Sequence, residues 1–87
     1  MVDELKTIRD FIRYSASQMA GQGVFLGHGS DQVMDEAYTL VLHALHLPFD
    51  LDGSYLDCNL MEEEKHDVLK LLAQRVEDRV PLPYLMG

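Results

Sequence analysis

The stretch DQVMDEAYTLVLHALHLP, from Asp31 to Pro48, decides the fold. Its apolar residues recur at intervals of three and four, the spacing that places side chains on one face of a helix. They are Met34, Ala37, Tyr38, Val41, Leu42 and Leu45. Because proline cannot continue a helix, Pro48 marks the end of the pattern. The stretch therefore predicts an amphipathic helix from about Asp31 to His46.

The same period appears on both sides of this stretch. One segment runs from Asp3 to Gln22, where the glycines of GQG stop it, and its apolar positions are Leu5, Ile8, Phe11, Ile12, Ala16, Met19 and Ala20. Another follows Asn59, an expected helix cap with Glu62 as its partner, and its apolar positions are Met61, Val68, Leu69, Leu72, Val76 and Val80. Two prolines in VPLPYLMG, residues 80–87, end this helix at about Arg79.

Residues 47–58, LPFDLDGSYLDC, have no sustained period and predict an ordered loop with one helical turn. We expect its apolar residues to be buried, namely Leu47, Phe49, Leu51, Tyr55 and Leu56. No segment alternates like a strand, and 87 residues suffice for only one modest core. The predicted fold class is all-α, a small helical bundle of three long helices plus short turns, with a non-helical C-terminal exit.

The charge distribution divides the chain into three parts. All seven Lys and Arg residues lie within Lys6–Arg13 or Lys65–Arg79, whereas the segment between Tyr14 and Met61 has none. That segment carries Asp31, Asp35, Glu36, Asp50, Asp52 and Asp57, and the chain as a whole has a net charge of −8. Such a surface repels phosphate backbones and attracts basic partners, so we expect no direct nucleic-acid binding. Ordinary solubility is the simpler interpretation of the same charges.

The chain also shows no sign of a membrane or secretory role. No apolar run approaches the roughly 18 residues of a membrane span, and the charged start MVDELKTIRD lacks a signal-peptide core. The single cysteine, Cys58, cannot form an internal disulfide. We expect a cytoplasmic protein without membrane contact.

The stretch LGHGSDQVMDEA, from Leu26 to Ala37, is the segment most similar to a functional site. Ser30 or Asp31 is expected at the helix N-cap, with Asp35 and Glu36 in or beside the first turn, which leaves only His28 without a structural role. A Ser/His/Asp arrangement without a nucleophile elbow or an oxyanion hole does not indicate a hydrolase.

The remaining histidines do not indicate a metal site. His43 and His46 share a helix face, but neither a cysteine nor a carboxylate completes a ligand set at close spacing. His66, in EEEKHD, is expected on the solvated face of the third helix, where Glu62 and Glu63 are placed to pair at i,i+3 or i,i+4 with Lys65, His66 or the neighbours of Asp67. We therefore predict no catalytic, cofactor-binding or metal-binding residue in this chain.

Five short motifs, in order, resemble the N-terminal domain of the HemK-type protein-glutamine methyltransferases, specifically the ribosomal-protein branch called PrmB. These are Gly27–Asp31, Asp35–Ala37, Leu47–Asp50, Glu64–His66 and the exit with Arg79, Pro81, Tyr84 and Leu85. The chain departs from the branch pattern at residues 32–34, QVM, where members often have Pro-Trp. The release-factor branch shares the exit but lacks the Gly-His-Gly turn, so the ribosomal-protein branch is favoured.

The resemblance implies an enzyme whose chemistry lies beyond Gly87. The family transfers a methyl group from S-adenosylmethionine to a glutamine amide nitrogen, using an Asn-Pro-Pro-Tyr motif in a Rossmann-like C-terminal domain. Residues 1–80 are then a substrate-recognition domain, and residues 81–87 begin the linker to the catalytic domain, with Pro81, Pro83, Tyr84 and Gly87 as linker residues. The expected partner is a basic ribosomal protein of the large subunit.

Residues with a possible substrate contact are His28, Ser30, Asp31, Asp50, Asp52 and Asp57. The alternative from another functional class is a stand-alone helical adaptor or structural domain. Such a bundle would have no use for the PLPYLMG tail, which favours the recognition domain.

Overall fold

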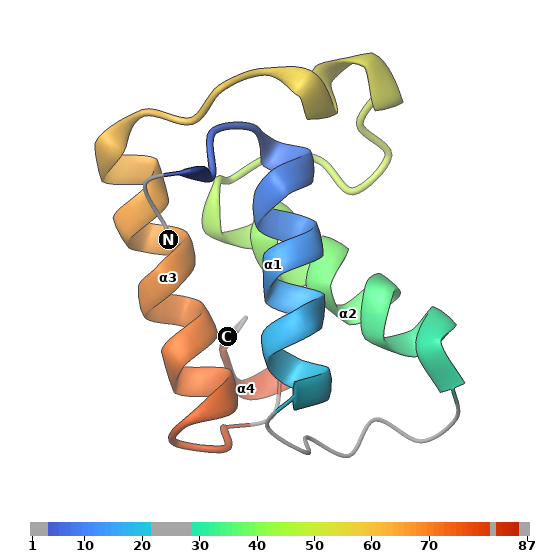
Figure 1. Cartoon of the computed structure of the whole chain (residues 1–87), viewed down its shortest axis with the longest axis vertical. Coiled ribbons are helices and arrows are strands. Elements are labelled where there is room, and N and C mark those ends of the chain that lie inside the picture. Colours follow the sequence, from blue (N-terminus) through green and yellow to red (C-terminus); the bar gives the residue numbers. More distant parts are fainter. Residues whose placement is uncertain (1–3, 22–28, 81, 86–87) are drawn as a thin grey trace.

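In the described residues, three long helices and a cross-connection form the bundle, and a short fourth helix follows them (Figure 1). The computed structural model describes residues 4–21, 29–80 and 82–85, with only the backbone at residues 29–32 and 82. Helix α1 spans Ile8–Gly21, α2 spans Gly29–Ala44 and α3 spans Glu62–Val76. Figure 1 shows that α1 and α3 run in the same direction and that α2 runs back behind α1 at an angle. The predicted all-α bundle of three long helices is confirmed.

Helix α1 begins at Ile8, five residues later than the pattern predicted, because Thr7 caps it. The Thr7 hydroxyl accepts a hydrogen bond from the Asp10 N–H (3.0 Å), and the Asp10 carboxylate accepts one from the Thr7 N–H (3.0 Å). This reciprocal arrangement satisfies two N–H groups that a helix start otherwise leaves free. Just before the cap, the Lys6 carbonyl accepts the Leu60 N–H (2.7 Å), which ties this segment to the start of α3.

Helix α2 packs against both other long helices, α1 and α3. Three successive residues, Leu40, Val41 and Leu42, are completely buried, so α2 is covered on more than one side. The buried face of α1 supplies Phe11, Ile12, Ala16 and Met19 to the same core, and α3 supplies Val68, Leu72 and Val76. Met34, expected in the core, is instead 45% exposed.

The end of α2 is formed by a Schellman motif. The Leu47 N–H donates to the Leu42 carbonyl (2.9 Å) and the His46 N–H to the His43 carbonyl (3.0 Å). His46 takes the left-handed conformation that this motif needs, with φ of 61°. The helix thus ends at Ala44, two residues before the predicted end, and Pro48 follows the motif.

The connection from α2 to α3, residues 47–61, crosses the end of the bundle where α1 begins (Figure 1). It contains one short helix, η2, spanning Gly53–Asp57, as the sequence predicted. Leu51 and Leu56 are partly buried, but Phe49 (49% exposed) and Tyr55 (56% exposed) contradict the expectation that all apolar residues of this connection are buried.

The start of α3 differs from its prediction. The helix begins at Glu62, and the N-cap is Met61, where the Glu64 carboxylate accepts the Met61 N–H (2.8 Å). Asn59 lies two residues earlier and forms an isolated antiparallel bridge with Thr7, so the predicted Asn59 cap is wrong. Met61, expected on the apolar face of this helix, precedes it and is 70% exposed. The predicted pairing along the first turn is present, with Lys65 Nζ 3.2 Å from Glu62 Oε2.

The C-terminal exit is not fully non-helical, which corrects the prediction. Helix α3 ends at Val76, three residues before the expected Arg79, and α4, spanning Leu82–Leu85, adds one helical turn that packs against α3. Pro83 falls inside this turn, where an early proline costs no helix hydrogen bond. In the described residues, no helix is long and apolar enough to cross a membrane.

Candidate substrate-binding surface

Three of the sequence-predicted contact residues, Asp50, Asp52 and Asp57, lie on the connection between α2 and α3. All three side chains are exposed. Their surroundings differ, however, and the differences decide which carboxylates are available to a partner.

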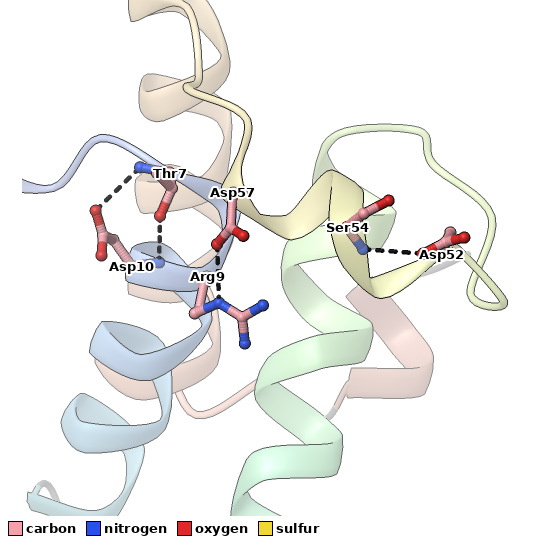
Figure 2. A network of polar contacts seen from close by, with 6 residues as sticks. All are labelled: Thr7, Arg9, Asp10, Asp52, Ser54 and Asp57. Carbon is pink, nitrogen blue, oxygen red and sulfur yellow. Dashed lines mark hydrogen bonds and ion pairs between the residues drawn. The ribbon is translucent and has the colours of Figure 1, made fainter.

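Asp52 has a structural role at the start of η2. Its carboxylate accepts a hydrogen bond from the Ser54 N–H (2.9 Å), as Figure 2 shows. This backbone hydrogen bond lowers the pKa of Asp52 below its ordinary value, since it favours the ionised form. The carboxylate therefore holds the turn in shape as well as adding negative charge.

Asp57 is paired with a cation from the beginning of α1. Arg9 Nε lies 3.1 Å from Asp57 Oδ1, and both side chains are well exposed. Figure 2 shows the two groups facing one another across the contact between α1 and η2. Of the three carboxylates on the connection, the charge of Asp57 is thus offset by a cation, which the base-free sequence around Asp57 did not indicate.

Glu36 also has a basic partner. Its carboxylate accepts a hydrogen bond from Arg75 Nε of α3, and the two side chains are only 16% and 10% exposed. Because α2 begins at Gly29, Asp35 and Glu36 lie in the middle of the helix, and their predicted place in or beside the first turn is wrong. Glu36 joins two helices and is not part of an open acidic surface.

A groove of about 350 Å³ opens between α1, α2 and η2, next to the Arg9–Asp57 pair. Its apolar part consists of Ile12, Met34, Leu56 and the ring of Tyr38. The Tyr38 hydroxyl donates to the Phe49 carbonyl (2.8 Å), which holds the start of the connection against the groove wall. The charged residues at the groove are Arg9, Arg13 and Asp35. Sequence reasoning missed this groove because its walls come from three distant segments.

The structure tests few of the other predicted contact residues. His28 lies outside the described residues, and at Ser30 and Asp31 the backbone is described as part of α2. Since the helix begins at Gly29, Ser30 and Asp31 are in its first turn and the predicted N-cap at either position is wrong. A role of His28 in substrate contact stays a prediction.

Of the four predicted linker residues, the structure describes two. Pro81 and Gly87 lie outside the described residues, whereas Pro83 and Tyr84 belong to α4. Tyr84 is 78% exposed.

Two histidines line a second, more polar pocket. His43 and His46 lie at the end of α2, opposite Asp67 and Lys70 of α3. In the described part of the chain, no three His, Cys, Asp or Glu residues come close enough together to hold a metal ion.

The described surface is thus suited to binding through an apolar groove and flanking charges.

Comparison with known proteins finds relatives that share one name. The chain is 52% identical over 85 residues to the ribosomal protein uL3 glutamine methyltransferase of Xylella fastidiosa, covering 98% of this chain and 27% of the relative. Proteins of the same name from Bordetella pertussis (49% over 84 residues; 97% and 28% covered) and Francisella tularensis (41% over 86 residues; 99% and 27% covered) are also similar.

No family model matches the chain, and no solved structure matches it significantly. The resemblance to the ribosomal-protein branch of the glutamine methyltransferases is nevertheless confirmed, because the relatives that align with nearly the whole chain are named as ribosomal protein glutamine methyltransferases. The chain spans little more than a quarter of the length of these curated relatives.

Proposed function

We propose that this chain is the N-terminal substrate-recognition domain of an S-adenosylmethionine-dependent methyltransferase that modifies a glutamine side-chain amide of a large-subunit ribosomal protein. The observation that carries the proposal is the 52% identity over 98% of the chain to a relative named as a uL3 glutamine methyltransferase. The name of the relative supports uL3 as the substrate, and modification of a ribosomal protein favours a cytoplasmic location.

The chemistry explains why such an enzyme needs a recognition domain. The lone pair of an amide nitrogen is delocalised into the carbonyl group, so the nitrogen is a weak nucleophile. Methyl transfer therefore depends on holding the glutamine at attack geometry, and restricting its motion can supply a large part of the rate enhancement. In the proposal, residues 1–80 bind the ribosomal protein, and residues 81–87 lead to the catalytic domain.

The cofactor belongs to that further domain. The described residues form helices and one isolated bridge, and they contain no parallel sheet of the kind that binds such cofactors. When bound, S-adenosylmethionine supplies the methyl group. The contribution of this chain is to bind the protein substrate and hold it in place.

The proposal is tested with the complete enzyme, purified with its ribosomal protein substrate and isotopically labelled S-adenosylmethionine. We expect label at one glutamine, located by mass spectrometry after digestion. If the complete protein transfers no methyl group to the ribosomal protein, the proposal is wrong. A reading frame without roughly 200 further residues, the size of a catalytic domain, would favour the alternative of a stand-alone adaptor.

A second test uses the 87-residue chain alone. We predict no methyltransferase activity and no measurable binding of S-adenosylmethionine, because the described residues form no sheet of the kind that binds this cofactor. Isothermal titration calorimetry measures the affinity directly, with the complete enzyme as the positive control. Micromolar binding by the isolated chain would contradict the assignment of the cofactor to another domain.

A further inference from the structure

The short helix α4 differs from the long helices in composition. Its sequence, LPYL, is apolar at every position, whereas α1, α2 and α3 all carry charged residues. A helix that is apolar all round is normally buried on all sides. Helix α4 packs against α3, and Leu85 is partly buried, but Pro83 and Tyr84 are exposed. Within the described residues, one apolar side of α4 therefore has no cover.

Tyr84 is the main feature of that side. It is 78% exposed, which makes it the most exposed large apolar residue in the described part of the chain. Tyrosine has a large, mostly apolar ring, and aromatic residues are enriched in protein interfaces. A helix of one turn also has little stability of its own and depends on packing. Both properties indicate that the exposed side of α4 is a contact surface.

The position of α4 in the chain indicates what covers this surface. The aligned segment makes up only 27% of the relative from Xylella fastidiosa, and in the proposed function the catalytic domain follows residue 87. Tyr84 precedes Gly87 by three residues, which span at most about 11 Å when fully extended. The chain that leads to the catalytic domain therefore leaves close to Tyr84. A domain attached by a short connection has a high effective concentration at a nearby surface.

We infer that the exposed side of α4 packs against the catalytic domain of the complete enzyme, with Tyr84 buried in the contact. The inference rests on the proposed function. It makes α4 an interface element that orients the recognition domain, and not only a part of the linker. A fixed orientation of the two domains presents the bound glutamine to the active site in one geometry, which favours attack by a weak nucleophile.

The first experiment compares two tyrosines of the complete enzyme by hydroxyl-radical labelling and mass spectrometry. Tyr84 and Tyr55 are 78% and 56% exposed in this domain, so without a further contact Tyr84 is labelled at least as fast as Tyr55. We expect Tyr84 to be labelled about fivefold more slowly, because residues in the core of an interface are removed from water. The enzyme unfolded in urea gives the reference rate of each tyrosine. Labelling of Tyr84 close to its unfolded rate would overturn the inference.

The second experiment removes the ring. Tyr84→Ser changes the exposed side of α4, whereas Tyr55→Ser removes the same ring from η2 and is the matched control. Arg79 lies in the segment before α4, where separation of the domains favours cleavage by trypsin. We expect cleavage after Arg79 to be about tenfold faster in Tyr84→Ser, because truncation of a buried interface tyrosine increases the population of the open state. Tyr55→Ser should be cut at the parent rate. Equal rates in the two variants would contradict the inference.

Two other occupants give different labelling results. Protection of Tyr84 that appears only after the ribosomal protein is added assigns α4 to the substrate. Protection that increases with enzyme concentration assigns it to a second copy of the chain. Either result overturns the inference. Failure to methylate the ribosomal protein contradicts the proposed function itself, and the two failures are distinguishable because labelling of Tyr84 requires no activity.

Discussion

Ser15 shows how a single atom in the core of this small domain affects its stability. Its side chain is completely buried on the inner face of α1, and its hydroxyl has no hydrogen-bond partner in the described part of the molecule. A buried polar group without a partner loses its hydration and gains nothing in return. The residue therefore destabilises the folded state.

We predict that Ser15→Ala stabilises the domain by about 1 kcal/mol, because the substitution removes the unsatisfied hydroxyl and alanine has the higher helix propensity. Urea unfolding measures the difference. Ser17→Ala is the matched control, since Ser17 is exposed on the same helix and reports the propensity alone. Equal stabilisation by the two substitutions would mean that the buried hydroxyl costs nothing.

Asp10 gives a pH-dependent contribution at the start of the same helix. The N–H groups of Lys6 and then Thr7 donate to its carboxylate, and these hydrogen bonds lower its pKa below the ordinary value of 3.8. A carboxylate with a depressed pKa adds stability that is present above the unfolded-state pKa and lost as the pH falls through the folded-state pKa.

The Asp10→Asn variant should therefore be less stable than the parent at neutral pH, and the difference should shrink below about pH 3.8 as the parent carboxyl is protonated. Thermal unfolding between pH 2 and pH 7 follows this change, with Asp67→Asn on the exposed face of α3 as the control. A difference that stays constant over the whole pH range would show that the charge of Asp10 is unimportant.

At the scale of elements, the Glu36–Arg75 pair fixes how α2 and α3 lie against each other. The two side chains are mostly removed from water, so each charge depends on the other for compensation. Removing one partner from such a pair costs about 3–5 kcal/mol, whereas replacing both by apolar residues is often neutral. A domain of 87 residues has a total stability of only about 4–13 kcal/mol.

We predict that Arg75→Met strongly destabilises the domain, and that the double variant Glu36→Leu with Arg75→Met recovers most of the loss. Urea unfolding of the parent, both single variants and the double variant completes the thermodynamic cycle. If the double variant is as unstable as the sum of the single ones, the two residues are not coupled and the pair does not join the helices.

The elements also show what the sequence could and could not predict. The period of apolar residues predicted three helices and their inner faces because that pattern is local, and Phe11, Val41 and Leu72 are buried as expected. Helix ends were less predictable, since Thr7 and His46 act through hydrogen bonds that many residues could form. The groove at Met34 depends on how α2 packs across α1, and the local spacing of apolar residues does not predict that packing.

At the scale of the whole molecule, folding rearranges the three charge segments of the sequence. Arg9 forms an ion pair with Asp57, and Arg75 forms one with Glu36. Two of the six carboxylates in the base-free segment therefore gain basic partners. Asp35 and Asp50 remain exposed, and Asp35 also lines the groove. The acidic surface that a basic partner meets is therefore smaller than the sequence suggested.

Reversing Asp35 and Asp50 to Lys in the complete enzyme should lower the association rate with the ribosomal protein and flatten its dependence on salt. Attraction between exposed charges acts mainly on the rate of encounter, and salt screens it over about 8–10 Å at physiological ionic strength. Stopped-flow association at several salt concentrations measures both effects. The control reverses Glu63 and Asp67, two exposed acids of α3, which changes the net charge equally. The two reversed variants have the same net charge. A smaller effect in the control would therefore mean that Asp35 and Asp50 themselves attract the ribosomal protein during encounter. Equal effects would mean that only the total charge of the chain matters for encounter, and the acidic residues near the groove would then have no particular role in substrate binding.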